Sequence, residues 1–155
     1  MINEKIDNCI QRVSLLKKDH KPESSEEVIK NAETKLNILL PKDFRILCTF
    51  YGYDYFHLFE FYNFDIGVIE ETLKFRKNCN LPHNYIVLTQ DNDVSFVLLK
   101  TISAEESEVI WCDYMDFFNL CDGKPMVYNP TIFATFTDFY EFLLDEEEKS
   151  LAENS

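Results

Sequence analysis

Histidines are the first side chains to consider for acid–base chemistry, and their contexts do not favour that role. His20, His57 and His83 lie in unrelated stretches of the chain. A general base needs a partner within hydrogen-bond reach. His57 is three residues from Glu60 on a predicted strand, so the two side chains would point to opposite faces of it. We therefore expect His57 to be a half-buried structural imidazole.

Cysteines are the candidate nucleophiles and metal ligands. The sequence has five, at positions 9, 48, 79, 112 and 121, with no Cys-x-x-Cys pair. Zinc ligands usually come in closely spaced pairs, so a zinc site is not predicted. Cys112 stands beside Asp113, which would raise its pKa, and Cys79 falls at a predicted helix C-terminus, where the dipole disfavours a thiolate. Cys48 and Cys112 are expected to be small core residues.

Carboxylates could bind a metal or share a proton. Asp91 and Asp93 flank Asn92 in an Asp-x-Asp pattern that could coordinate a hard cation. A calcium loop would continue to a glycine and a distant glutamate, which this sequence lacks, so a plain hairpin turn is favoured. The three glycines lie too far apart to form a phosphate-binding loop. No catalytic, cofactor-binding or metal-ligating residue is predicted.

The acidic residues can instead form a binding surface. They occur with aromatic residues at predicted hairpin ends and loops in the second half of the chain. At protein interfaces, aromatic rings bury area at the centre, while charges set the rate and register of association. Solvated loops are the alternative for the acids, and a place in the core is favoured for Trp111. The predicted partner-binding residues are Asp91, Asp93, Glu105, Glu106, Glu108, Asp113, Tyr114, Asp116 and Asp122.

Composition limits the kind of partner. The chain has 155 residues, 46% of them hydrophobic and 15% aromatic, which suits one domain spanning 1–155. It has 15 basic and 28 acidic residues, for a net charge of −13, and 101–155 alone carries 2 basic and 13 acidic residues. A chain this acidic repels phosphate groups. Nucleic acid and anionic membranes are therefore not predicted partners, and a basic protein is the predicted partner. The alternative is that the charge serves solubility alone, with 145–155 as a solvated tail.

The cellular setting is predicted from what the sequence lacks. It has no apolar run near ~20 residues and no hydrophobic signal segment at its start. The odd number of cysteines fits a reducing environment. We therefore expect a cytoplasmic protein.

Periodicity and turn residues predict the elements that must position these side chains. Ser24 with Glu27 is a capping-box signal, Pro41 can open a helix, and Thr137 is the expected cap of the last helix. Residues 114–125 could be a short helical turn or a loop. The predicted elements are helices at 2–18, 24–36 and 41–52, a strand at 56–61, a helix at 68–79, a hairpin of 85–89 with 94–99, a strand at 109–113, a weaker strand at 126–129 and a C-terminal helix.

Helices first, an antiparallel meander later and a closing helix predict an α+β fold. In it, N-terminal helices pack on a mainly antiparallel sheet that a C-terminal helix closes. In the predicted helix before Pro41, Ala32 and Leu36 share an apolar face with Leu39 or Leu40. In the predicted helix that Pro41 opens, Phe44 and Leu47 lie on one apolar side.

An ordered set of motifs resembles the SUKH superfamily of Smi–Knr-like domains. It begins with Ala32-Glu33, Leu36, Leu40-Pro41, Phe44 and Tyr51-Gly52. It continues with LPHNYIVLTQDND, VIWCDY and ATFTDFYEFLL in the same order as in that family. The resemblance covers residues 26–144. Two departures are the Asp91-Asn92-Asp93 turn, where a glycine is frequent, and Cys112 between Trp111 and Asp113.

The resemblance implies a binding protein rather than an enzyme. Bacterial members of the family are typically immunity proteins, so the implied function is to neutralise a cognate polymorphic or contact-dependent toxin. We expect that toxin to be a nuclease whose basic site the carboxylates occlude. A regulatory scaffold with an endogenous partner is the alternative, and a small-molecule enzyme would need a site that the sequence does not name.

Overall fold

The computed structural model describes residues 3–16, 26–50, 56, 58, 64–91 and 94–154. These form the α+β fold that the sequence predicts, with a four-stranded antiparallel sheet. The helices are α1 (Glu4–Leu16), α2 (Glu26–Leu36), α3 (Lys42–Phe50), α4 (Ile69–Cys79), α5 (Tyr114–Cys121) and α6 (Phe136–Glu153), with a π-helical turn, η1 (Phe64–Val68), before α4. The strands are β1 (Tyr85–Asp91), β2 (Ser95–Thr101), β3 (Ser107–Asp113) and β4 (Thr131–Phe133).

The strands follow one another across the sheet in chain order. Every neighbouring pair is antiparallel, and β2 and β3 pair along their full length, from Ser95 opposite Asp113 to Thr101 opposite Ser107. Strand β1 has a bulge between Val87 and Thr89. This arrangement confirms the predicted hairpin and the predicted strand at 109–113.

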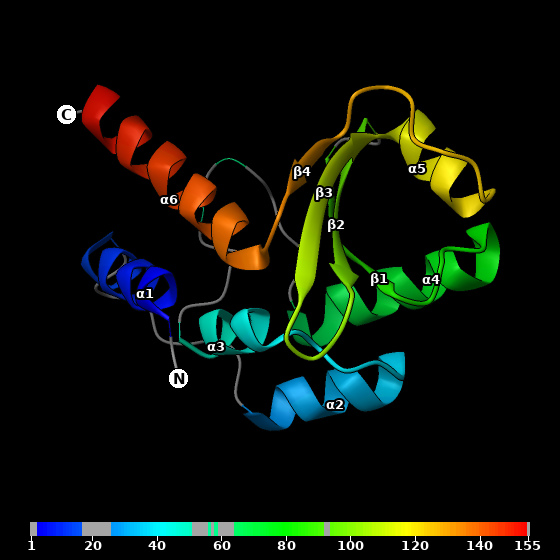
Figure 1. The fold of residues 1–155 in the computed structure, drawn as a ribbon, viewed down its shortest axis with the longest axis horizontal. Helices are drawn as coiled ribbons and strands as arrows, with labels where there is room; N and C mark the ends of the chain where they lie inside the picture. Colours follow the sequence, from blue (N-terminus) through cyan, green and yellow to red (C-terminus); the bar gives the residue numbers. More distant parts are fainter. Residues whose placement is uncertain are drawn as a thin grey trace.

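Alternation along the strands divides the buried side chains between two cores, one on each face of the sheet. Ile86, Val97 and Val109 face the larger core, which also contains side chains of α1, α2, α3 and α6. Phe96 and Ile110 face the smaller core, which α5 and the end of α4 cover. Figure 1 shows α1, α3 and α6 on one side of the sheet and α5 on the other.

The N-terminal helices form where the apolar spacing predicts them. In α1 the buried residues are Ile6, Cys9 and Val13, three or four apart. Helix α3 begins directly after Pro41, whose carbonyl accepts from the Arg45 N–H (3.0 Å). Leu40 is fully buried and Leu39 is 65% exposed, which resolves the alternative left open at that pair.

Two local predictions are wrong. Residues 126–129 are not a strand, because the Val127 and Tyr128 N–H groups donate to the carboxylate of Asp116, and the fourth strand is Thr131–Phe133. The cap of the last helix is Thr135, whose side chain accepts from the Asp138 N–H; Thr137 is buried and bonded elsewhere.

Other predictions are refined or lie outside the described residues. Residues 114–121 form a helix, and α6 extends through the acidic residues 145–153. Nearly all of the predicted strand at 56–61, the Ser24 cap and the helix end at Gly52 lie outside the described part of the chain. Among the described helices, none combines the length and the apolar composition that a membrane crossing requires.

Candidate interaction surface

Most of the predicted partner-binding residues lie near one end or the other of β3, and Asp122 lies at the far end of α5. Asp91 is opposite Ser95, and Ser95 is opposite Asp113, so both acids lie at the end where β3 leads into α5. Glu105, Glu106 and Glu108 lie at the other end, where β2 leads into β3. A seven-residue strand places its ends about 20 Å apart. Asp93 lies outside the described residues.

Asp116 is separated from solvent, although it lies near the end of β3 that leads into α5. Its side chain is fully buried, and its two oxygens accept from the N–H groups of Val127 (2.7 Å) and Tyr128 (3.0 Å). The neighbouring Asp113 caps α5 by accepting from the Asp116 N–H (2.8 Å). Asp116 therefore ties the chain after α5 to the helix and has no oxygen facing a partner.

Exposed apolar side chains gather around α5, and we call this set the α5 surface. Tyr114, Met115 and Phe118 are on the helix itself. The other three are on segments bonded to α5: the Val94 carbonyl accepts from the Tyr114 N–H (2.9 Å), and the Val127 and Tyr128 N–H groups donate to Asp116. The set and its exposed fractions are Val94 60%, Tyr114 47%, Met115 41%, Phe118 44%, Val127 63% and Tyr128 48%.

Of this set, only Tyr114 is among the partner-binding residues predicted from the sequence. The available signal is the apolar composition of α5, in which Tyr114, Met115 and Phe118 are exposed in addition to buried Phe117 and Cys121. The apolar face of this helix is thus wider than the part that the core covers. Val127 and Tyr128 join the set only through their bonds to Asp116, which the sequence does not show.

Helix α5 is held firmly to the sheet by aromatic contacts. Phe117 stacks on Phe96 of β2, with ring centroids 3.8 Å apart and planes within 4°. Phe75 of α4 meets both rings edge-on, at 5.1 Å from Phe117 and 5.6 Å from Phe96. Such contacts add to the free energy of burial. The exposed side of the helix is thus fixed by its buried side.

The acids near α5 differ from those of α6 in their ion pairing. Lys5 of α1 contacts Asp138 at 2.7 Å, and Arg12 contacts Asp145 at 2.7 Å, each with a further α6 glutamate within 3.4 Å. The hydrogen bond that Arg12 donates to the Glu148 carboxylate is the main cause that raises the pKa of Arg12. Asp91, Asp113 and Asp122 form no ion pair with any residue that the structure describes.

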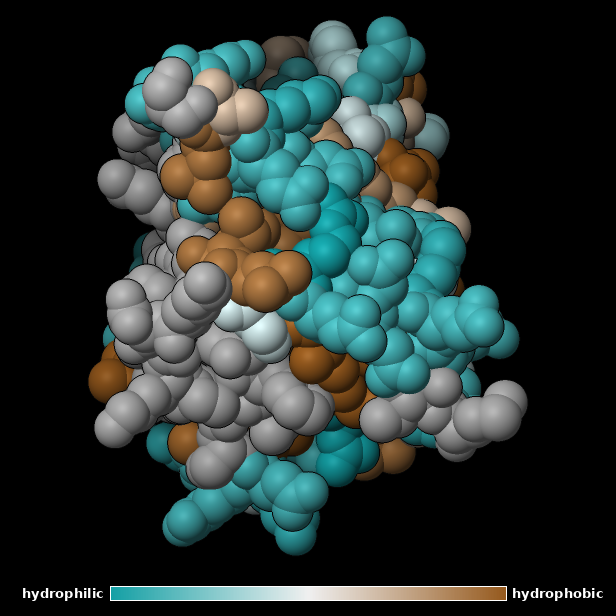
Figure 2. Space-filling view, turned by 90° about the vertical axis from the view of Figure 1, so that its left-hand side faces the viewer, coloured by the Kyte–Doolittle hydropathy of each residue, from teal (hydrophilic) through white to brown (hydrophobic). Residues whose placement is uncertain are grey.

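The side of the molecule that carries α1 and α6 is correspondingly polar. Figure 2 shows that its described residues are mostly hydrophilic, with smaller hydrophobic areas among them. On this side, Lys5 and Arg12 of α1 each pair with two acidic residues of α6.

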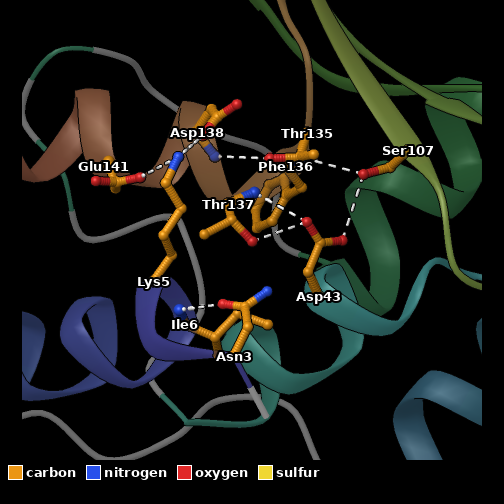
Figure 3. Close-up of polar contacts among 10 residues, drawn as sticks. All are labelled: Asn3, Lys5, Ile6, Asp43, Ser107, Thr135, Phe136, Thr137, Asp138 and Glu141. Carbon is orange, nitrogen blue, oxygen red and sulfur yellow. Dashed lines mark hydrogen bonds and ion pairs between the residues drawn. The ribbon is translucent and has the colours of Figure 1, made fainter. Parts of the chain in front are cut away.

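At the start of β3, a partly buried polar network joins three elements (Figure 3). Asp43, in the first turn of α3, accepts from the Thr137 N–H and hydroxyl, both at 2.9 Å, and from the Ser107 hydroxyl at 3.3 Å. Ser107 in turn accepts from the Phe136 N–H at 3.1 Å. The network joins the N-terminal ends of α3 and α6 to β3.

A cavity of about 260 Å³ adjoins this network. Its wall has both signs of charge, with Lys5 and Lys42 beside Asp43, Glu105 and Asp138. Lys5 is paired with Asp138, and Asp43 is satisfied by protein donors. The remaining charges, Lys42 and Glu105, are opposite in sign and define no single class of ligand.

Three of the cysteine thiols are poor nucleophiles because they are buried. Burial is the main cause that raises the pKa of Cys9 and of Cys112 to about 12, and that of Cys121 to about 11. Cys48 and Cys112 are buried, as predicted. Over the described residues, no group of three or more His, Cys, Asp or Glu side chains could hold a metal ion.

His83 and Arg76 form hydrogen bonds that stabilise the fold. The ring N–H of His83 (Nε2) donates to the Asn37 carbonyl at 2.8 Å. Arg76 donates to the carbonyls of Leu36 (2.6 Å) and His83 (2.7 Å), and burial lowers its pKa. These bonds fasten the end of α2 to α4 and the approach to β1.

Comparison with known proteins gives one match. A family model described as SMI1-KNR4 cell-wall, of the SUKH group, matches residues 2–118. No curated protein and no solved structure matches the chain.

Proposed function

The chain belongs to the SUKH family, and on that premise we propose that it is an immunity-type binding protein that neutralises a cognate bacterial toxin. The toxin that suits its charge is a nuclease with a basic active site. The protein acts by occupying that site and performs no chemistry of its own.

One observation carries the proposal. Carboxylates at both ends of β3 have no ion-pair partner among the described residues, whereas four acids of α6 are paired with Lys5 and Arg12 of α1. Unpaired acids keep their negative potential for another molecule. A nuclease site that binds phosphates attracts such carboxylates, because both ligands are anionic oxygens.

This mechanism predicts how the complex forms. Opposite charges raise association rates above the ~10⁵–10⁶ M⁻¹s⁻¹ of neutral protein pairs, and salt reduces the gain. The association rate constant should therefore fall by about tenfold or more from low to high salt, while the dissociation rate constant changes less.

The test uses the toxin domain encoded next to this chain's gene. Cells expressing that domain should survive when they also express this chain, and the purified pair should show the salt-dependent association rate. Survival with an association rate that ignores salt would retain the immunity function and refute electrostatic occlusion. If the chain binds no such domain and instead binds a protein of its own cell, it is a regulatory scaffold and the proposal is wrong.

A further inference from the structure

We propose that the α5 surface (Val94, Tyr114, Met115, Phe118, Val127 and Tyr128) is the docking face of this chain, and that its occupant is a basic protein domain. The proposed function leaves open which surface binds. This assignment rests on that function for the identity of the partner, and on the geometry around α5 for the site.

The α5 surface is strongly apolar. Six large side chains, each at least 41% exposed, belong to one short helix or to backbone segments bonded to it. Exposed apolar groups concentrated in one region mark interaction sites more often than isolated ones do. Tyr, Phe and Met are also the residue types enriched at the centres of interfaces.

The acidic residues around the α5 surface favour a basic protein as the occupant. Asp91, Asp113 and Asp122 flank the surface, and Lys124 is the basic residue near them in the chain. A basic domain meets these acids favourably. A second copy of this chain would bring the same acids together at a net charge of −13 per chain, so it is the disfavoured occupant.

The α5 surface is already ordered in the free protein. The rings of Phe117, Phe96 and Phe75 fix α5, and buried Asp116 holds Val127 and Tyr128 against it. Docking therefore loses little backbone entropy, which is a main cost of association. An ordered apolar surface that nothing in the described chain covers is suited to recognition.

The acids at the other end of β3 form a weaker candidate. Of the described residues in that connection, Ile102 is the exposed large apolar side chain, at 50%. The loop is held by its own bonds, such as those from the Glu105 and Glu106 N–H groups to Ser103 Oγ. Charge without apolar area speeds encounter but slows dissociation little.

The main experiment measures dissociation of the complex with the toxin domain. Phe118→Ala and Tyr128→Ala should each raise the dissociation rate constant about tenfold or more, because anchors at interface centres give the largest losses. Leu15→Ala and Leu39→Ala are matched controls, since both leucines are at least as exposed (71% and 65%) and lie on or after other helices. Equal rates for all four variants would overturn the assignment.

Charge variants separate the two ends. Asp122→Asn should lower the association rate constant more than Glu105→Gln does, by about twofold or more. Larger effects at Glu105 would place the docking face at the other end of β3. In that event the toxin is still neutralised, so the surface assignment fails while the proposed function stands.

A second experiment needs no toxin. The probe is a synthetic helical peptide of alternating lysine and leucine turns, followed by amide NMR shifts of this protein. At 1 M salt, where the screening length is about 3 Å, shifts should persist at α5 and at 126–128 and vanish at 105–108. Shifts that vanish everywhere would refute an apolar docking face. Shifts at α5 without toxin binding would refute the proposed function alone.

Self-association is the remaining outcome to examine. The chain should be monomeric at the concentrations used for binding. If it forms a dimer that Phe118→Ala dissociates, the α5 surface is an interface between copies and the proposed occupant is wrong.

Discussion

Near each end of β3, a carboxylate of a neighbouring helix accepts hydrogen bonds from other parts of the chain, yet the two ends differ in what surrounds that carboxylate. At Ser107, Asp43 joins α3, β3 and α6, beside the larger core. At Asp113, Asp116 joins α5 only to the segment that follows it, and several apolar side chains remain exposed. The first end closes the fold, and the second presents a surface.

This difference shows that the acids of one chain can serve opposite purposes. A carboxylate whose oxygens accept backbone N–H groups stabilises the fold and is lost to a partner. An exposed carboxylate with no ion pair among the described residues, such as Asp122, keeps its charge at the surface. Position along the sequence does not separate the two kinds, because Asp116 lies on α5 and Asp122 directly follows it, and Asp116 alone is buried.

The largest expected effect is at Asp43. Asp43→Ala removes the acceptor for the Thr137 N–H, the Thr137 hydroxyl and the Ser107 hydroxyl, and leaves buried donors unpaired. We expect the free energy of unfolding to fall by about 3 kcal/mol or more. Urea denaturation of the purified variant measures this fall.

The matched control for Asp43 is the exposed Glu105 beside the same cavity. Glu105→Ala should change the free energy of unfolding by less than about 0.5 kcal/mol. If both variants unfold at the same urea concentration, the network around Asp43 does not hold the elements together. The contrast between the two ends of β3 would then be lost.

A smaller effect is expected at Asp116. Asp116→Asn keeps one acceptor oxygen but places an amide NH₂ group against the N–H of Val127 or Tyr128. We expect a loss of about 1–3 kcal/mol and faster hydrogen exchange of those two amides. Exchange measured by NMR in the free protein tests this directly.

Asp122→Asn is the control for Asp116, because Asp122 is exposed at the end of α5. Its stability and the exchange of the Val127 and Tyr128 amides should match those of the parent chain. Unchanged exchange in Asp116→Asn would mean that the segment after α5 is held by other contacts, and that the α5 surface is ordered without this carboxylate.

The elements of the fold could be predicted because their signals are local. Ile6, Cys9 and Val13 recur at helical spacing, and the runs at β1 and β2 are rich in β-branched and aromatic residues. The wrong predictions arose where a distant side chain competes for a local group. Asp43, 94 residues away, binds Thr137, and Asp116 captures the amides that would have made a strand at 126–129.

The candidate site was predicted only in part for a related reason. Acids and aromatics close in sequence were expected to be close in space, which holds for Asp113 and Tyr114 at the start of α5. A strand between two groups separates them, as β3 separates Glu105 from Asp113. Burial decides the rest, and whether Asp116 faces inward depends on a segment that lies more than ten residues further along the chain.

The smallest expected effect concerns the pH dependence of stability. One buried thiol in each core reports how well that core excludes water. Burial raises the pKa of Cys9 in the larger core and of Cys112 in the smaller core to about 12, above the ordinary value near 9. In the unfolded chain these thiols ionise first as pH rises. Their contribution to stability is therefore present below about pH 9 and is lost as pH rises toward 12.

Alkaline unfolding should show this loss in both cores. Between pH 8 and 10, the parent chain should lose stability relative to Cys9→Ala and to Cys112→Ala, by about 1.4 kcal/mol in each case. The comparison of each variant with its own value at pH 8 removes the cost of the lost sulfur atom. If the dependence of stability on pH changes in Cys9→Ala but not in Cys112→Ala, water reaches the smaller core under α5. An α5 surface resting on such a core would not be the rigid docking face that its aromatic contacts indicate.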